Sequence, residues 1–303
     1  MLSLYSYFMI GNDDLSKGEK QLLFSIEKIN DLYFYLLLLI LEVVDFAKIK
    51  TENNKLKRLP SHNDLFPNTK FIDNKFIQQL SVNKTLKRES AKRNLGWQDQ
   101  QELVKKIYSE LIISKEYNKY LASEKDDYNF DRDFIVNFFK NQISELEFLH
   151  FILEEKSLYW VNDIEFICSM IGKTIKTFNE SSDENTPLLS LWKDEEEDTR
   201  FVINLFRQSV IHSKDYEKLI GDKTDNWEMD RISMMDVLLM KMSIAEIINF
   251  PSIPINVSIN EYIDISKDYS TEQSGTFING ILDKIIEDLK TDNKIMKIGK
   301  GLM

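Results

Sequence analysis

The sequence is poor in residues that interrupt helices and in residues that bind metals. It has nine glycines, five prolines, three histidines and one cysteine among 303 residues. The single cysteine, Cys168, excludes a disulfide framework or a cysteine-based metal cluster within the chain and favours a reducing setting. The prolines fall at 60, 67, 187, 251 and 254, so long stretches contain no helix breaker. These scarcities predict an all-α protein.

Catalytic constellations are also missing. His62, His150 and His212 are scattered along the chain and do not have the spacing of a metal site. No glycine-rich phosphate loop occurs, and Cys168 has no local partner that could activate it. We therefore expect no catalytic residue, no metal ligand and no cofactor, which leaves a binding protein and not an enzyme.

The longest apolar run, YFYLLLLILEVV at 33–44, contains Glu42 and follows Asp31. This run is too short to span a bilayer, so it predicts a buried helix. The chain opens without the charged-then-apolar pattern of a secretory leader. We expect a cytoplasmic protein that does not associate with a membrane.

The formal net charge is −11, but the charges are unevenly distributed. Residues 51–94 contain ten lysines or arginines against four acids, whereas residues 180–198 contain eight acids and one lysine. One interpretation is a pair of separate surfaces, of which the basic one could meet phosphate groups. The alternative is a pair of solvated linkers, and the sequence does not choose between them.

The chain resembles itself at an offset of 67 residues. FIVNFFK at 134–140 aligns with FVINLFR at 201–207, and the similarity continues without gaps for about 30 residues. Trp160 aligns with Trp227, and Asp163 aligns with Asp230. Amphipathic helices share apolar positions by chance, but two tryptophans at one offset favour duplication. The pattern predicts a duplicated helix pair, with residues 130–180 packed like residues 197–250.

The C-terminal third predicts two amphipathic helices joined by a capped turn. The first enters after Pro254 and buries Ile255, Ile259, Tyr262, Ile263 and Ser266 on one face. Ser270 and Gln273 fit a capping box, so a second helix should begin there. Its apolar stripe comprises Phe277, Ile278, Ile281, Leu282, Ile285, Ile286 and Leu289. Gly280 inside this helix predicts the close approach of another helix or of a ligand.

These C-terminal strings resemble one known family. WEMDRISMMDVLLMKMSIAEIINF, then V-x-I-N-E and F-x-N-G-x-L-D-K, are similar to the last helices of the NusB family, and LYSYF at 4–8 resembles the end of its first helix. The resemblance covers about 100 residues, roughly 198–290. It implies an all-α, NusB-like helical bundle that carries an inserted helical unit. The internal repeat suggests that this inserted unit arose by duplication.

The resemblance also implies an organisation for the whole chain. Residues 1–50 would form the N-terminal helices of the NusB-like domain, residues 197–290 its C-terminal helices, and residues 291–303 a tail. The insertion at 51–196 would contain a basic linker (51–95), extra helices (98–180) and an acidic linker (180–196). The segment 51–95 is either mobile or carries short helices. Hydrophobic periodicity predicts helices near 2–10, 17–49, 98–124, 130–155, 160–178, 197–219, 227–249, 256–268 and 271–290.

The function that the resemblance implies is transcription antitermination. Family members pair with NusE, a small-subunit ribosomal protein, and the pair binds boxA-type single-stranded RNA in the elongation complex during ribosomal RNA transcription. The RNA-binding residues that carry over are Tyr5, Glu272, Gln273, Thr276 and Phe277. Glu246 carries over as a partner-binding residue that faces NusE. Tyr5 and Phe277 also fit an ordinary core role.

One departure from the family concerns its basic N-terminal segment. The family places an arginine-rich segment before the first helix, whereas this sequence has no basic residue before Lys17. Either the start was assigned too late, which is the preferred explanation, or phosphate contacts have moved to residues 51–94. Two other functions compete: a scaffold that keeps the NusE surface without RNA binding, and a truncated accessory domain of an RNA methyltransferase. The latter requires a following cofactor-binding domain of strands and glycine turns.

Overall fold

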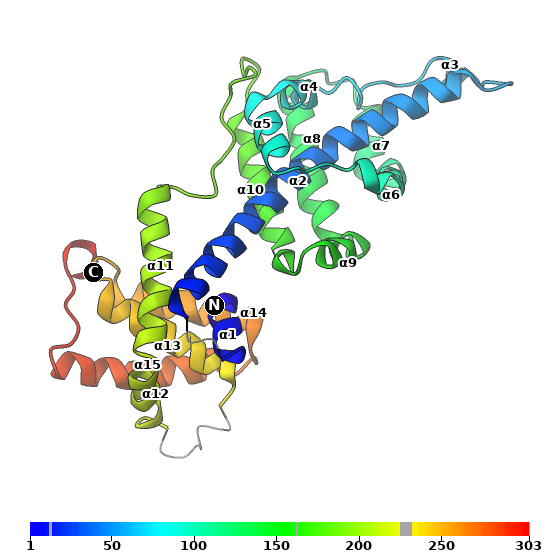
Figure 1. Cartoon of the computed structure of the whole chain (residues 1–303). Coiled ribbons are helices and arrows are strands. Elements are labelled where there is room, and N and C mark those ends of the chain that lie inside the picture. The colour runs from blue at the N-terminus through cyan, green and yellow to red at the C-terminus, as the bar shows by residue number, and fades with distance from the viewer. Residues whose placement is uncertain (12–13, 162, 225–231, 303) are drawn as a thin grey trace. The chain divides into compact units, whose positions relative to one another are not determined.

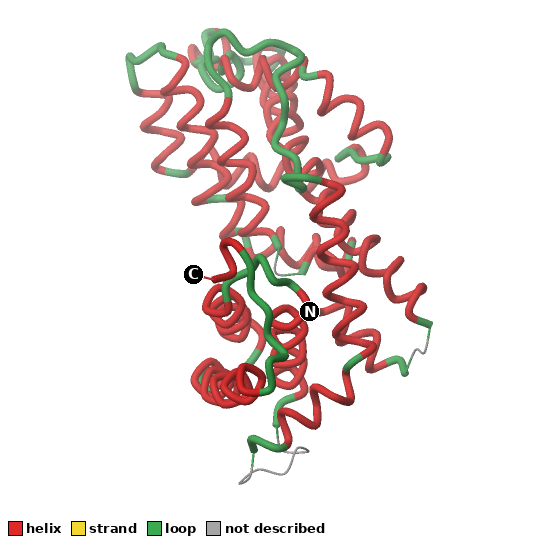
Figure 2. Tube along the Cα trace, turned by 90° about the vertical axis from the view of Figure 1, so that its left-hand side faces the viewer, coloured by secondary structure: helices red, strands yellow, loops and turns green. Residues whose placement is uncertain are grey.

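The computed structural model describes residues 1–11, 14–161, 163–224 and 232–302. All regular elements in this described part are helices, so the predicted all-α fold is confirmed (Figures 1 and 2). The chain divides into two compact units: unit 1 comprises Met1–Ser25 and Trp192–Met303, and unit 2 comprises Ile26–Leu191. None of the described helices combines the length and the apolar character that crossing a membrane requires.

Unit 1 is built around one helix, α13 (Met234–Asn249). Eleven of its 16 residues are buried, which explains why its sequence is apolar on nearly every side. The helices that pack against α13 are α1 (Leu2–Met9), α11 (Glu195–Ile211), α12 (Ser213–Gly221), α14 (Ile255–Tyr269) and α15 (Ser274–Thr291) (Figure 1). A short 3-10 turn, η5 (Gly299–Leu302), follows α15.

Three charged side chains of α13, those of Asp236, Lys241 and Glu246, are buried with partners. The Lys241 ammonium donates to the Ser213 hydroxyl at 3.0 Å and to the Glu217 carboxylate at 2.8 Å, both on α12. It also lies 5.5 Å from the centre of the Phe8 ring of α1. Because a buried charge without partners is costly, these contacts fix how α1 and α12 lie on α13.

Unit 2 contains most of the longest helix, α2 (Leu15–Lys55), which begins in unit 1. The other α-helices are α3 (His62–Leu65), α4 (Lys75–Val82), α5 (Lys84–Lys92), α6 (Gln101–Ile113), α7 (Lys115–Ala122), α8 (Tyr128–Asn141), α9 (Glu147–Lys156) and α10 (Ile164–Thr177). Three 3-10 turns lie between them: η1 (Gln98–Gln100), η2 (Ile143–Glu145) and η3 (Leu158–Trp160).

The core of unit 2 forms around the middle of α2. The predicted burial of residues 33–44 is confirmed, since the leucines and isoleucine at 36, 37, 39 and 40 are fully buried. The Trp97 ring stacks on Tyr35 with 4.1 Å between ring centres. Its indole nitrogen donates to the Tyr35 carbonyl at 2.8 Å. This buried donor therefore has a partner, as a tryptophan inside a core requires.

Three of the helices expected from periodicity are each two helices. The stretch 98–124 breaks at Ser114, whose hydroxyl accepts the Tyr117 amide and caps α7. The stretch 130–155 breaks between Asn141 and Glu147, and the stretch 197–219 breaks at His212. Apolar residues recur on both sides of each break, so the expected range extended across it. Periodicity alone therefore did not reveal these corners.

The basic segment 51–95 carries short helices, which is the second of the two alternatives expected for it. Asn74 and Asn83 are fully buried and cap α4 and α5 by accepting amides three residues on. Asn83 also donates to the Thr186 carbonyl at 2.8 Å, in the acidic stretch. The Phe76 and Phe178 rings pack edge to face at 5.4 Å. The basic and acidic segments therefore both contribute to the structure of unit 2.

The offset of 67 residues relates three helices to three others. We name α8, α9 and α10 the first triplet, and α11, α12 and α13 the second triplet. Shifted by 67, α8 and α11 begin at the same position, and α9 and α10 fall on α12 and α13 within a few residues. Asp127 and Asp194 cap α8 and α11 in the same way, each accepting an amide three residues on. The helix bounds therefore support a duplication, and extend it to three helices. Trp227 and Asp230 lie outside the described residues.

Candidate nucleic-acid interface

The turn between α14 and α15 is tied to the first turn of α13 by one buried carboxylate. Asp236 accepts a hydrogen bond from the Ser270 hydroxyl at 2.6 Å and another from the Ser274 hydroxyl at 3.0 Å. The Thr271 amide in turn donates to Ser274 Oγ at 3.2 Å. Hydrogen bonds to a charged group are stronger than those between neutral groups. The turn is therefore held in one place relative to α13.

The capping box predicted for this turn is wrong. The Ser270 hydroxyl is bonded to Asp236, and α15 begins at Ser274 with Gln273 as an N-cap that makes no side-chain bond. The local cap is absent because α15 begins at Ser274, four residues after Ser270, and Ser270 is therefore not at its N-cap position. Ser274 was not singled out in the sequence, since no local pattern links it to a residue 38 positions away.

The start of α15 presents polar side chains to solvent. Glu272, Gln273 and Thr276 are exposed, whereas Phe277 is partly buried against the core of unit 1. Four of the five predicted RNA-binding residues thus lie together within two turns of chain. The amide of Gln273 and the hydroxyl of Thr276 can both donate and accept hydrogen bonds, as recognition of base edges requires.

Gly280 continues this exposed face one turn further along α15. A Cβ atom built at Gly280 would have no neighbouring atom within 4 Å. The predicted close approach of another helix is therefore wrong for the described part of the chain. Positions 273, 276 and 280 follow helical spacing, so the glycine leaves a flat area beside the two polar side chains.

Tyr5 lies on a different element from the other four residues. It is partly buried against the core of unit 1 on α1, next to the buried Tyr7. The Tyr7 ring packs edge to face with Phe206 of α11 at 5.6 Å. Helix α1 packs against α13, and the α14–α15 turn is hydrogen-bonded to α13 through Asp236. Tyr5 and the turn are therefore connected through α13.

Glu246, predicted to contact a partner, lies inside unit 1. Only 6% of its surface is exposed, and the Tyr262 hydroxyl donates to its carboxylate at 2.8 Å. Burial and the Glu246 carboxylate raise the pKa of Tyr262 well above its usual value. Burial also lowers the pKa of Lys297, an effect that the same carboxylate opposes. Glu246 therefore joins α13 to α14 and does not present its carboxylate to solvent.

Most cations of the basic segment 51–94 are bound within the chain. Arg93 pairs with Asp31 at 2.7 Å and Glu27 at 3.0 Å, and Lys57 pairs with Asp64 at 2.9 Å. The others with partners are Lys55, Lys70, Lys75, Lys84 and Arg88. Arg58, Lys87 and Lys92 make no such contact with the described residues. Residues already paired are less available to phosphate groups, which weakens the interpretation of this segment as a phosphate-binding surface.

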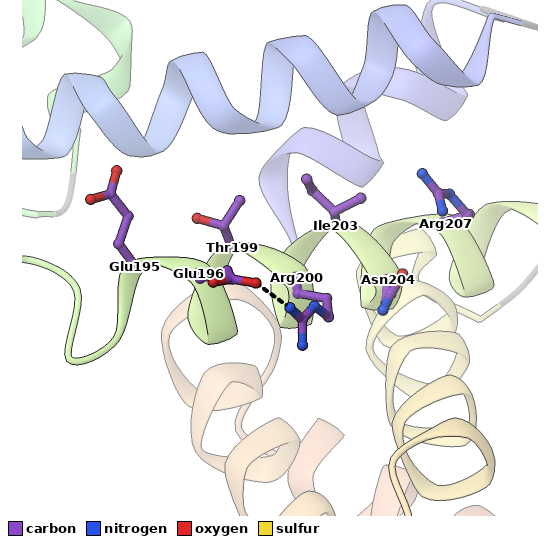
Figure 3. A pocket seen from close by; sticks show the side chains of 7 residues that line it. All are labelled: Glu195, Glu196, Thr199, Arg200, Ile203, Asn204 and Arg207. Atoms are coloured by element: carbon purple, nitrogen blue, oxygen red, sulfur yellow. Dashed lines mark hydrogen bonds and ion pairs between the residues drawn. The ribbon is translucent and has the colours of Figure 1, made fainter.

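A shallow hollow of about 660 Å³ follows one face of α11 (Figure 3). Within it, Arg200 pairs with Glu196 at 2.6 Å, while Arg207 pairs with Glu19 at 2.8 Å. Its lining mixes acids and bases, and both arginines already have carboxylate partners, so it offers no concentrated charge to a ligand. Among the described residues, no group of three His, Cys, Asp or Glu side chains could hold a metal ion.

A helical domain whose hydrogen-bonded turn presents polar and aromatic side chains has the features of a macromolecule-binding module. The family model described as "NusB family" matches residues 162–287, from the start of α10 through most of α15. The chain is 40% identical to the "Transcription antitermination protein NusB" of Salinibacter ruber over 111 residues, which is 36% of this chain and 69% of that protein. The chain belongs to the NusB family.

Other relatives give the same result. Proteins of the same name from Chloroherpeton thalassium and Methylacidiphilum infernorum are 37% and 36% identical, over 34% and 33% of this chain. The match spans 49% of the first relative and 73% of the second. A solved structure of T. maritima NusB is 26% identical and covers 50% of this chain and 91% of its own, with a TM-score of 0.29.

Proposed function

We propose that this protein is a non-catalytic transcription antitermination factor that binds boxA-type single-stranded RNA together with NusE, in the elongation complex, during ribosomal RNA transcription. The observation that carries the proposal is the α14–α15 turn, which Asp236 holds in place and which exposes Glu272, Gln273 and Thr276. Membership of a family whose relatives are named transcription antitermination proteins supports the general role.

The chemistry of this turn suits single-stranded RNA better than a duplex. Unpaired bases are recognised by hydrogen bonds to their edges and by stacking on aromatic rings. Gln273 and Thr276 supply the hydrogen bonds, and the partly exposed Phe277 supplies a ring beside them. Gly280 lets a base approach the helix backbone without meeting a side chain.

Electrostatics explain why a partner is part of the proposal. Phosphate neutralisation normally supplies much of the affinity for RNA, yet the net charge is −11 and Glu272 adds a negative charge at the turn. NusE would then contribute cations or complete the surface. Glu246 would act on NusE only indirectly, by holding α13 against α14 through Tyr262.

The test is a fluorescence titration of boxA-like RNA with the full chain, in the presence and absence of NusE. Substitution of Gln273 and Thr276 by alanine should weaken binding to the complex, by about 1 kcal/mol for each lost hydrogen bond. Lys290→Ala is the matched control, because Lys290 is exposed on α15 about 21 Å from Thr276. Equal affinities for the double variant and the control would reject the turn as the RNA site.

A scaffold that binds NusE without RNA is the second candidate. The observation that favours it is the pairing of the basic segment, in which Arg93, Lys57 and Lys75 already contact acids. The same titration separates the two functions. Absence of RNA affinity even for the NusE complex, with NusE still bound, would establish the scaffold and exclude RNA binding.

A further inference from the structure

Unit 2 contains a groove between α8 and α10 that the proposed function does not use. Its volume is about 480 Å³, and its floor is formed by Val136, Cys168 and Gly172. Burial raises the pKa of the Cys168 thiol to about 12, so the floor is uncharged at neutral pH. A Cβ at Gly172 would lie 3.8 Å from Val136 Cγ1, in ordinary contact, so the missing side chain adds to the depth of the groove.

The charged side chains at this groove are separated along its length. Lys173 and Lys176 lie on the C-terminal half of α10, whereas Glu165 lies in its first turn. At 1.5 Å per residue, Glu165 is about 12 Å from Lys173 along the helix axis. Lys140 and Glu145 complete the charged lining from the neighbouring α8 and η2. The two lysines of α10 therefore form a basic end that is distinct from an end of mixed charge.

Lys173 and Lys176 are neighbours of like charge without an acid between them. Residues three apart on a helix have Cβ atoms about 5–6 Å apart, and like charges at this spacing are destabilising. Both side chains are exposed, and neither ammonium makes an ion pair or hydrogen bond with the described residues. An anion placed between them would remove the repulsion.

The helix dipole explains only part of this arrangement. Lys140 and Lys176 lie in the last turns of α8 and α10, where cations are favoured. Lys173 lies one turn earlier, where the dipole gives little reason for a cation. Ser169, a further turn back on the exposed side of the groove, adds a hydroxyl that can donate to an oxyanion.

The duplication shows that this face of α10 is open where its counterpart is closed. At the offset of 67, Lys173 and Lys176 correspond to Met240 and Ser243 of α13, both fully buried in unit 1. Two further helices, α14 and α15, pack against α13, whereas α10 packs chiefly against α8 and η2. The first triplet thus has lysines on the face that the second triplet buries.

We propose that the α8–α10 groove binds a phosphate group between Lys173 and Lys176 at its basic end, with the Ser169 hydroxyl as an additional donor. The phosphate could be free or part of a single-stranded nucleic acid, because both present the same oxyanion. Lysine binds phosphate as a point charge, so two neighbouring ammonium groups can hold it without a preformed cage.

The test uses the full chain and two probes, inorganic phosphate and a 12-nucleotide single-stranded RNA. The variant is the double substitution Lys173→Gln and Lys176→Gln, and the control is Lys87→Gln with Lys92→Gln. Both pairs are exposed in unit 2, and neither contacts an acid among the described residues. Phosphate should shift the amide resonances of Ser169 and Gly172 in the wild type and in the control, but not in the variant.

The RNA probe identifies the source of the phosphate. If the groove binds RNA, the slope of log K against log salt should fall by about 1.4 for the variant, since two cations are lost at about 0.7 each, and by less for the control. An unchanged RNA slope with lost phosphate shifts would assign the groove to free phosphate. Identical phosphate shifts in variant and wild type would overturn the site. Phosphate shifts need no RNA, so this outcome is independent of the α14–α15 turn.

Discussion

The Tyr262 hydroxyl donates a 2.8 Å hydrogen bond to the Glu246 carboxylate and thereby joins α14 to α13 inside unit 1. The carboxylate is almost wholly buried, so removal of this donor leaves a charge without its partner. A family resemblance alone places Glu246 on a partner surface, whereas the structure gives it a role in stability. Substitution of Glu246 by lysine would therefore disturb the fold as well as any partner contact.

Tyr262→Phe should lower the free energy of unfolding by about 1.5–3 kcal/mol, because the buried Glu246 carboxylate loses a hydrogen bond. Urea denaturation followed by circular dichroism measures the change. Tyr216→Phe is the control, since the Tyr216 hydroxyl receives only a long 3.4 Å bond from Asn249. Equal losses for the two variants would contradict a special contribution from Glu246.

Stability should also fall at alkaline pH. The pKa of Tyr262 is raised in the folded state, so its phenol stays protonated there while the unfolded chain ionises near its usual value of 10.0. Above that pH the unfolded state gains stability relative to the folded state. Urea midpoints measured from pH 8 to 11 should therefore decline above about pH 10. A smaller decline is expected for Tyr262→Phe.

Asp163, the N-cap of α10, should make unit 2 more stable under mildly acidic conditions. Burial raises the pKa of Asp163 to about 6 from 3.8, so the folded state binds a proton more tightly than the unfolded chain. The contribution is fully present below about pH 4 and is lost as the pH rises through 6. Asp163→Asn should remove this dependence, which unfolding midpoints between pH 4 and 7 would reveal. An unchanged pH profile would show that another group is responsible.

Gly280→Ala should stabilise the protein by about 0.8–1 kcal/mol, since the added methyl group meets no atom and alanine favours a helix. Thermal unfolding checks this gain. Gly275→Ala should gain less, because its Cβ would lie 3.4 Å from Ile263 Cγ2. If RNA approaches the flat area at Gly280, Gly280→Leu should weaken binding while preserving stability. Undiminished RNA affinity would place the RNA elsewhere.

Asp236→Ala should loosen the α14–α15 turn. Ser270 and Ser274 would lose their carboxylate acceptor, and a hydrogen bond to a charged group contributes about 1.5–3 kcal/mol. Faster hydrogen exchange of the Thr271 and Ser274 amides would report the loosening. Exchange rates equal to those of the wild type would show that packing alone holds the turn.

The sequence predicted much of the helical content because apolar periodicity is a local property. The sequence alone indicated the buried run around Leu36, the amphipathic α14 and the offset linking α8 to α11. The Asp236–Ser274 contact was not, since it joins residues 38 positions apart through a single charge. The inward orientation of Glu246 was hidden for a related reason. A glutamate within an apolar helix is expected to be exposed, and the sequence does not show that Tyr262 supplies a buried partner for Glu246.

The enclosure of α13 has a consequence for how unit 1 unfolds. Five helices lie against it, so the backbone amides of its buried middle, residues 238–247, cannot reach solvent unless several neighbours separate at once. Local fluctuations would therefore expose the exchangeable hydrogens of α15 or α1 long before those of α13. The slowest exchange in unit 1 should come from α13, and its rate would report the global opening of that unit.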